Sequence, residues 1–311
     1  MEFDRSSQAT SGNIIADMRY AWGAAASRDG DYSEAAGIFQ QALELAPGWA
    51  QGWMALGEAR EKSGDLIGAI EAYGHAPALD PSGLLGAQLR LAALGATLAP
   101  SIAAPAYVRA LFDQYAPQFE THLVGALSYC GPALLLAALE RACTATGRVF
   151  HFDRGFDLGS GTGLMAQALV PRVTTLIGVD LSPKMNDLAR ATGFYNQLHA
   201  RDVTAFLSEE TAASSDLVVA ADVFVYMGDL APIFAASADV LEPGGLFAFS
   251  VQCGAGLAWS LGADLRYLHS KQYLRALADA HGFEAIVLDD ASTRKNAGTD
   301  MPGLVCVLAR L

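Results

Sequence analysis

Charged residues are scarce in this chain, and basic residues are scarcer than acidic ones. Only 17% of the 311 residues are charged, with 20 Lys and Arg against 33 Asp and Glu, so the formal net charge is −13 and the isoelectric point lies near 4.8. No run of Lys and Arg interrupts this pattern, and an acidic surface repels phosphate backbones. The composition therefore argues against nucleic acid as a partner.

Cysteine is also rare, and long apolar runs are missing. The four cysteines, at positions 130, 143, 253 and 306, form no C-x-x-C pair and have no group of His residues beside them, which predicts reduced thiols and no metal site. No apolar run reaches the roughly 18 residues of a membrane-spanning helix. The first residues lack the basic and apolar regions of a signal peptide. We therefore expect a cytoplasmic protein without a membrane partner.

Apolar residues make up 52% of the chain, and the first third of it contains an internal repeat of 34 residues. Small residues at matching positions let two helices approach closely, an aromatic residue fills the gap to the next helix, and proline ends each unit. The matching pairs are Gly23/Gly57, Gly30/Gly64, Asp31/Asp65, Ala35/Ala69, Phe39/Tyr73, Ala42/Ala76 and Pro47/Pro81. The segment resembles tetratricopeptide repeats, and its second copy matches their pattern better than its first.

The resemblance implies an all-α tetratricopeptide-repeat module over residues 1–98. Two copies are few for a stable stack, so an apolar stretch over residues 84–98 is expected to add a capping helix. Pro77 is expected to end the last helix of the second copy early, or to bend it. Such a module can present a groove to a peptide or protein partner, or it can serve as a platform for folding or oligomerisation.

We expect a linker and lid helices over residues 99–145 and an α/β domain over residues 146–311. From Phe156 onward, short β-rich runs alternate with helix-length segments, which is typical of a doubly wound, mostly parallel sheet with helices on both faces. The strand candidates are residues 155–158, 175–180, 216–221, 245–251, 284–289 and 303–309.

A glycine-rich turn follows the first predicted strand and opens a helix near Leu164. Its sequence is Asp157-Leu158-Gly159-Ser160-Gly161-Thr162-Gly163. Three glycines clear side chains from the turn, so a ligand can lie against the backbone at the carboxyl edge of the sheet. The dinucleotide fingerprint would need glycine in place of Leu164. Asp157 sets a carboxylate ahead of the turn, which suits the ammonium group of a cationic ligand.

Two further acids follow the next strands. Asp180 ends the second predicted strand, where a carboxylate can accept hydrogen bonds from both hydroxyls of a ribose. Leu181 comes next, and a helix start after it brings Met185 near an adenine. Asp202 can accept a hydrogen bond from the adenine amino group, with the backbone of Val203 beside the ring. Alternatively, Asp202 caps a helix that begins at Val203.

In order and spacing, these features resemble the Rossmann-like methyltransferases that use S-adenosylmethionine, over about half of the chain. The resemblance also rests on residues 216–222 and on the turn Pro243-Gly244-Gly245. It implies that S-adenosylmethionine is the cofactor, with its methionine part on Asp157 and the glycine turn, its ribose on Asp180, and its adenine on Asp202 and Val203. With the repeats included, the chain resembles predicted methyltransferases that contain tetratricopeptide repeats, a group that specifies no substrate.

Methyl transfer requires a nucleophile in line with the sulfonium carbon and, where that nucleophile is protonated, a base. Asp222, just after the fourth predicted strand, is expected to border the methyl group, or else to cap the next helix. His269 and His122 are the candidate bases. Tyr115 is expected to belong to a lid over the cofactor, although Phe112, Tyr115 and Phe119 can equally form one stripe that faces the core.

The sequence therefore predicts a methyltransferase enzyme that acts on a small molecule or on a peptide or protein partner. The alternative is a non-catalytic tetratricopeptide-repeat adaptor with a cofactor-binding domain. A chain that had evolved into a non-catalytic adaptor would be expected to have lost Asp157, Gly159, Asp180 or Asp202. All four are present. A nicotinamide oxidoreductase is disfavoured because Leu164 stands where its third glycine would be.

Overall fold

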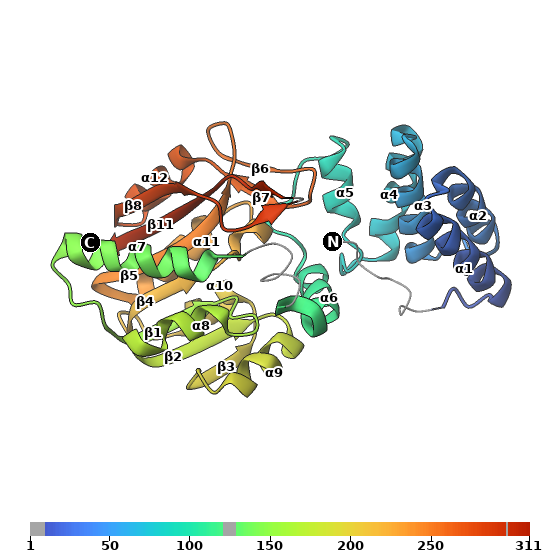
Figure 1. Cartoon of the computed structure of the whole chain (residues 1–311). Coiled ribbons are helices and arrows are strands. Elements are labelled where there is room, and N and C mark those ends of the chain that lie inside the picture. The colour runs from blue at the N-terminus through green and yellow to red at the C-terminus, as the bar shows by residue number, and fades with distance from the viewer. Residues whose placement is uncertain (1–9, 121–128, 297) are drawn as a thin grey trace. The chain divides into compact units, whose positions relative to one another are not determined.

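The chain folds as two compact units in a computed structural model that describes residues 10–120, 129–296 and 298–311 (Figure 1). The first unit comprises Met1–Tyr107 and Ala263–Leu265, and the second comprises Val108–Gly262 and Arg266–Leu311. No helix among the described residues is both long and apolar enough to cross a membrane.

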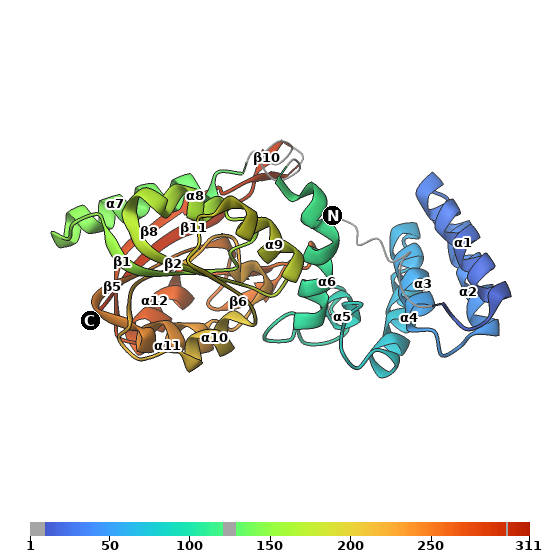
Figure 2. The ribbon, with the colours of Figure 1, turned by 90° about the horizontal axis from the view of Figure 1, so that it is seen from below.

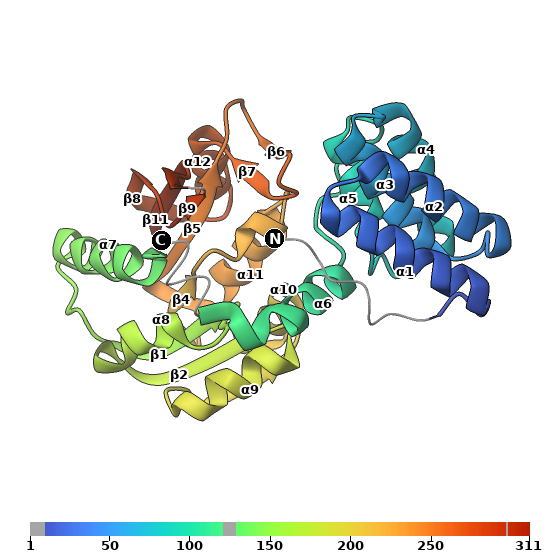
Figure 3. The same ribbon diagram turned by 45° about the vertical axis from the view of Figure 1, so that its right-hand side comes forward.

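The first unit consists of helices that pack side by side (Figure 3). They are α1 (Ile14–Asp29), α2 (Tyr32–Leu45), α3 (Ala50–Ser63), α4 (Leu66–Leu79) and α5 (Ala87–Ala93). The repeated glycine and aromatic residues pack in the same way in both copies. A Cβ atom on Gly23 would lie 2.8 Å from the Phe39 ring, and one on Gly57 would lie 2.4 Å from the Tyr73 ring. Small residues therefore bring α1 close to α2, and α3 close to α4, as the repeat predicts.

Pro77 does not end its helix early. Helix α4 continues through Pro77 to Leu79, so the expectation of an early end is wrong. Proline removes one backbone hydrogen bond, to the carbonyl of Tyr73, and Pro77 stands in the last turn of the helix. The full burial of Tyr73 and Ala76 outweighs that loss. The expected capping helix is present as α5, although it is shorter than the apolar stretch that predicted it.

The second unit is built on a doubly wound sheet, which confirms the predicted fold class. The strand order is β3-β2-β1-β4-β5-β11-β8. The first five strands in this order are parallel, and β11 runs antiparallel to both of its neighbours. The strands of this path are β1 (Phe152–Leu158), β2 (Val173–Asp180), β3 (Gln197–Ala200), β4 (Ser215–Ala220), β5 (Leu241–Cys253), β8 (Phe283–Ala291) and β11 (Gly303–Arg310).

Helices cover both faces of this sheet (Figure 2). One core holds side chains of α7 (Gly131–Thr146) and α8 (Leu164–Leu169), and the other holds side chains of α10 (Val203–Glu209), α11 (Ala231–Val240) and α12 (Lys271–Ala280). The remaining elements are α6 (Pro105–Tyr115), α9 (Pro183–Thr192), the 3-10 helices η1 (Ala116–Gln118), η3 (Val170–Arg172) and η4 (Phe224–Tyr226), and the short strands β6 (Trp259–Leu261), β7 (Tyr267–His269), β9 (Lys295–Asn296) and β10 (Thr299–Asp300).

Candidate functional site

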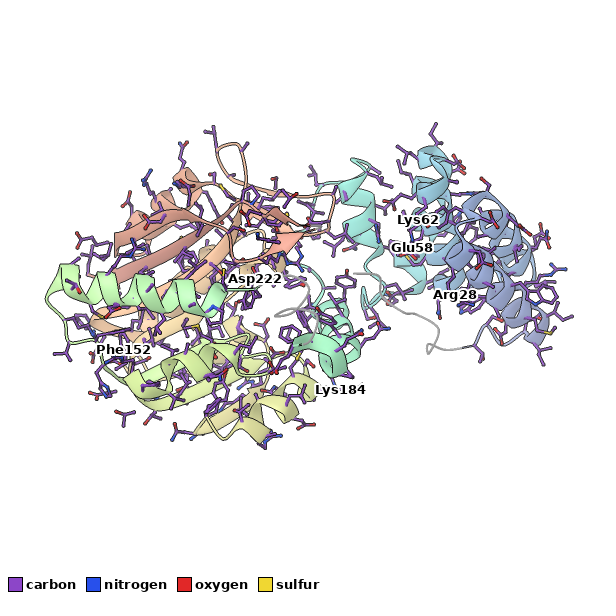
Figure 4. All side chains as sticks on the ribbon, in the orientation of Figure 1. Arg28, Glu58, Lys62, Phe152, Lys184 and Asp222 are labelled. Carbon is purple, nitrogen blue, oxygen red and sulfur yellow. The ribbon has the colours of Figure 1, made fainter. Side chains whose placement is uncertain are left out.

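The chain reverses its strand order between β1 and β4, and the segments after β1, β2 and β4 emerge together at that point. Leu158 at the end of β1 pairs with Val179 of β2 and with Ala220 of β4. Figure 4 shows Phe152, at the start of β1, and Asp222, just past β4, toward opposite edges of the sheet. Ligands of doubly wound sheets bind at the carboxyl edge, beside such a switch point.

Two glycines of the turn after β1 serve different purposes. Gly159 and Gly161 both adopt positive φ, at 67° and 53°. A Cβ atom on Gly159 would lie 2.4 Å from the side chain of Val223, so this residue must be small for the turn to pack against the segment after β4. A Cβ atom on Gly161 would meet no described atom nearer than 3.9 Å. The position at Gly161 thus has no close contact, and the nearest side chain to it is the Phe119 ring at 4.0 Å.

Asp157 is buried beneath this turn with one carboxylate oxygen in a hydrogen bond and the other without one. Its Oδ2 accepts a hydrogen bond from the Tyr195 hydroxyl at 2.5 Å. Burial raises the pKa of Asp157 to about 7, against the lowering effect of the Tyr195 hydrogen bond. Among the described residues, Asp157 Oδ1, Ser160 Oγ and Thr162 Oγ1 are buried and have no hydrogen-bond partner. Unsatisfied buried polar atoms are rare in folded proteins, and three of them here fit a ligand rich in hydrogen-bonding groups.

Asp180 connects the end of β2 to the glycine turn. Its Oδ2 accepts a hydrogen bond from the backbone N–H of Gly161 at 3.0 Å, and its Oδ1 accepts one from that of Ser182 at 2.8 Å. Burial raises its pKa to about 6, although these two hydrogen bonds lower it. A carboxylate can accept about four hydrogen bonds, so both oxygens retain capacity for hydroxyl donors.

The helix after Asp180 begins as predicted. Ser182 caps α9 by accepting a hydrogen bond from the Met185 backbone N–H, and Pro183 occupies the first helical position. Leu181 is half-buried, whereas the Met185 side chain is fully buried.

Asp202 is the N-cap of α10. Its Oδ1 accepts a hydrogen bond from the Ala205 backbone N–H at 2.8 Å. Asp202 therefore has the alternative role predicted for it, that of a helix cap. The cap uses one oxygen of the carboxylate. Val203, the first residue of α10, is 7% exposed.

Asp222 lies close to two arginines that the sequence did not indicate as site residues. It has φ of 61°, and its backbone N–H donates a hydrogen bond to Ser250 Oγ. Its Oδ2 lies 3.6 Å from Arg294 Nη1 and 3.8 Å from Arg266 Nη1. The alternative role for Asp222 as a helix cap is wrong, because η4 begins after Val223 and α11 begins after Leu230.

Aromatic residues of α6, together with Phe119, which follows η1, lie against the same edge. The Phe119 ring lies 4.0 Å from the Cβ position of Gly161, and the Phe112 ring contacts Tyr226 edge-on at 5.5 Å between centroids. Ser182 Oγ donates a hydrogen bond to Asp113 at 2.6 Å. Tyr115 is 4% exposed and packs edge-on against Phe119. The segment thus contacts the chain after β1, after β2 and after β4.

Of the two histidines considered as bases, the structure describes only His269. His269 is fully buried, and its Nε2 lies 2.9 Å from the carbonyl oxygen of Met227 and 3.1 Å from that of Gly228. Burial lowers its pKa to about 4, although these hydrogen bonds raise it. Donation from Nε2–H to these carbonyls fixes the orientation of the ring, and Nδ1 is buried without a hydrogen-bond partner among the described residues. His122 lies outside the described residues.

Comparison with known proteins agrees with this geometry. Residues 156–249 match the family model described as Methyltransferase domain. The ubiquinone biosynthesis O-methyltransferase of Paracidovorax citrulli (strain AAC00-1) is 32% identical over 108 residues, which cover 31% of this chain and 42% of that protein. The chain therefore spans less than half the length of this curated relative.

Solved methyltransferase structures are similar to part of the chain at low identity. The 1,6-didemethyltoxoflavin-N1-methyltransferase of Burkholderia thailandensis, solved with S-adenosylhomocysteine, is 18% identical with a TM-score of 0.48, over 64% of this chain and 87% of that one. The N-methyltransferase NodS of Bradyrhizobium japonicum is 18% identical with a TM-score of 0.43, over 56% of this chain and 85% of that one.

The family match agrees with the predicted methyltransferase domain over residues 156–249. The matched range contains the glycine turn together with Asp180, Asp202 and Asp222.

Proposed function

We propose that the protein transfers a methyl group from S-adenosylmethionine to a small-molecule acceptor. The observation that carries the proposal is the set of buried polar atoms around the glycine turn, Asp157 Oδ1, Ser160 Oγ and Thr162 Oγ1, which have no partner among the described residues. The contacts of Phe119 and Phe112 support a small acceptor over a folded protein, because aromatic side chains cover part of the carboxyl edge.

In this proposal each acid has one role toward the cofactor. Asp157 accepts a hydrogen bond from the ammonium group, Asp180 from the ribose hydroxyls, and the free oxygen of Asp202 from the adenine amino group, beside the backbone of Val203. When bound, S-adenosylmethionine supplies a methyl carbon on a positively charged sulfur. The chain positions the reactants and, through Phe119 and Tyr115, excludes water from the glycine turn. No base is assigned, because His269 is fully buried and burial lowers its pKa to about 4.

The proposal extends to the organisation of the whole chain. Residues 1–98 are assigned to a tetratricopeptide-repeat module, residues 99–145 to a linker and lid helices, and residues 146–311 to the cofactor-binding domain. The paired packing of Gly23 with Phe39 and of Gly57 with Tyr73 supports the repeat assignment. We assign to this module the binding of a peptide or protein partner, which would make a peptide the second candidate acceptor.

The test is calorimetric titration of the full chain with S-adenosylhomocysteine and with NAD. We expect S-adenosylhomocysteine to bind and NAD not to bind. Asp180→Ala should weaken S-adenosylhomocysteine binding by about 1–3 kcal/mol, since the ribose hydroxyls lose a charged acceptor. The matched control is Asp187→Ala, which removes a carboxylate with 72% side-chain exposure on α9. Equal affinity for the Asp180→Ala variant and the wild type would contradict the assignment.

A further inference from the structure

Tyr195 contacts the acid beneath the glycine turn, and the roles proposed above do not use it. It lies in the connection between α9 and β3, and its hydroxyl donates the 2.5 Å hydrogen bond to Asp157 Oδ2. The next residue, Asn196, bonds twice to the backbone of Leu176 in β2. Its N–H donates to the Leu176 carbonyl at 2.9 Å, and its Oδ1 accepts from the Leu176 N–H at 2.8 Å. The backbone beside Tyr195 is therefore fixed to the strand that neighbours β1.

Gly178 leaves the space that the Tyr195 ring occupies beside Asp157. In the register between β1 and β2, Gly178 pairs with Asp157 itself. A Cβ atom on Gly178 would lie 2.8 Å from the Tyr195 ring and 3.0 Å from the Cβ atom of Ser160. Gly178 does not have positive φ, so the backbone conformation does not require glycine here. Glycine inside a strand often marks a close approach of another group, and at Gly178 that group is the Tyr195 ring.

The Tyr195 hydroxyl keeps its proton near neutral pH and donates it to the carboxylate. Burial raises the pKa of Tyr195 well above its ordinary value, and the charge of Asp157 raises it further. The Ser160 carbonyl oxygen is a more distant neighbour of this hydroxyl, at 3.5 Å. Hydrogen bonds from hydroxyls to ionised carboxylates are short, at about 2.5–2.7 Å, and they favour the ionised form. Tyr195 thus occupies Asp157 Oδ2, whereas Oδ1 is buried without a partner among the described residues.

The other titratable neighbours of Asp157 do not favour its ionised form. Burial raises the pKa of Asp157, the Tyr195 hydrogen bond lowers it, and the charge of Asp180 at the end of β2 raises it again. Burial also raises the pKa of Tyr129, just before α7, and the charge of Asp157 contributes to that rise. Within the described part of the chain, Tyr195 is therefore the group that stabilises the Asp157 carboxylate.

From this geometry we infer that Tyr195 is a positioning residue for the cofactor site. Its hydroxyl holds Asp157 Oδ2 and keeps the carboxylate charged, which leaves Oδ1 to accept from the cofactor's ammonium group. Tyr195 acts through Asp157 in this role, without contact to the transferred methyl group. The inference rests on the proposed function, because the ammonium group belongs to the cofactor assigned there.

The experiment is calorimetric titration of the full chain with S-adenosylhomocysteine at pH 6.0 and at pH 8.5, for the wild type and for Tyr195→Phe. Phenylalanine keeps the ring beside Gly178 and removes only the hydroxyl. Without that hydrogen bond the pKa of Asp157 rises, so at pH 6.0 less of the carboxyl group is ionised. We expect the variant to bind about tenfold more weakly than the wild type at pH 6.0, and within about twofold of it at pH 8.5.

Tyr273→Phe is the matched control, because the Tyr273 hydroxyl also donates to a carboxylate, Asp229 Oδ1, at 3.0 Å. It should leave binding unchanged at both pH values. In an Asp157→Asn background, Tyr195→Phe should cause no further pH-dependent loss, since no carboxyl group remains for the hydroxyl to stabilise. Thermal unfolding reports the folding of each variant. Gly178→Ala, which displaces the ring, takes the place of Tyr195→Phe if that variant does not fold.

The dependence on pH separates positioning from general damage to the fold, which would weaken binding equally at both pH values. An equal loss at pH 6.0 and pH 8.5, no loss at all, or a pH-dependent loss that persists in the Asp157→Asn background overturns the role of Tyr195. Failure of the wild type to bind S-adenosylhomocysteine at either pH would instead overturn the proposed function, and the role of Tyr195 with it.

Discussion

Asp157 is a buried carboxyl group whose pKa is raised to about 7, first by burial and then by the charge of Asp180. A cationic ammonium group beside it favours the ionised form, so binding below pH 7 requires the loss of a proton. The affinity for S-adenosylhomocysteine should therefore be constant above about pH 7 and fall by up to about tenfold per pH unit below it. Calorimetry from pH 5.5 to 8.5, in two buffers of different ionisation enthalpy, measures both the affinity and the proton release.

The variant Asp157→Asn distinguishes the contribution of Asp157 to this pH dependence from that of Asp180. Asparagine cannot ionise, so binding should weaken and the remaining pH dependence should move toward the pKa of Asp180, which is about 6. A wild-type affinity that does not change between pH 5.5 and pH 8.5 would show that Asp157 does not meet the cofactor's charge.

The segment made of α6, η1 and Phe119 is the one most directly placed to cover a bound cofactor. Phe119 lies against the glycine turn, Asp113 accepts from Ser182, and Tyr115 supports Phe119 from its buried side. Backbone amides of residues 106–118 should therefore exchange hydrogen more slowly when the cofactor product S-adenosylhomocysteine is added.

Substitutions distinguish this covering role from simple core packing. Phe119→Ala and Tyr115→Ala should both weaken binding of S-adenosylhomocysteine. Phe150→Ala, which removes an aromatic ring just before β1 at the opposite edge of the sheet, should not. If protection on adding the product is confined to Asp157–Gly163 and both variants bind normally, Tyr115 is a core residue and the lid assignment is wrong.

The molecule as a whole contains separate apolar cores in its two units. The described clusters of the first unit, centred on Phe39 and Tyr73, share no residue with the two that line the sheet. A fragment of residues 105–311, which keeps α6 complete, should therefore fold and bind S-adenosylhomocysteine within about threefold of the full chain. Circular dichroism and calorimetry check this. Aggregation that is relieved by adding residues 1–104 would show instead that the units fold on one another.

Much of the fold could be predicted from local signals in the sequence. The predicted strand 155–158 lies within β1, the glycine turn precedes α8, and Ser182 and Pro183 start α9. Periodicity, turn residues and caps act over a few positions, so they can be recognised along the chain. The short strand β3 was missed because its residues are partly exposed and polar. The early helix end expected at Pro77 is absent because burial of its helix outweighed one lost hydrogen bond.

In the candidate site, too, only the features with a local signal could be predicted from the sequence. The glycines and the acids that follow β1, β2 and β4 could be found because each stands next to its strand. The partners of those acids could not, since Tyr195 reaches Asp157 and Arg294 reaches Asp222 from elements far away in the sequence. Burial is equally non-local: His269, a candidate base in the sequence, is fully buried with its Nε2 beside two carbonyl oxygens. Such contacts depend on which segments the folded sheet and helices bring together, and no local pattern of residues encodes that proximity.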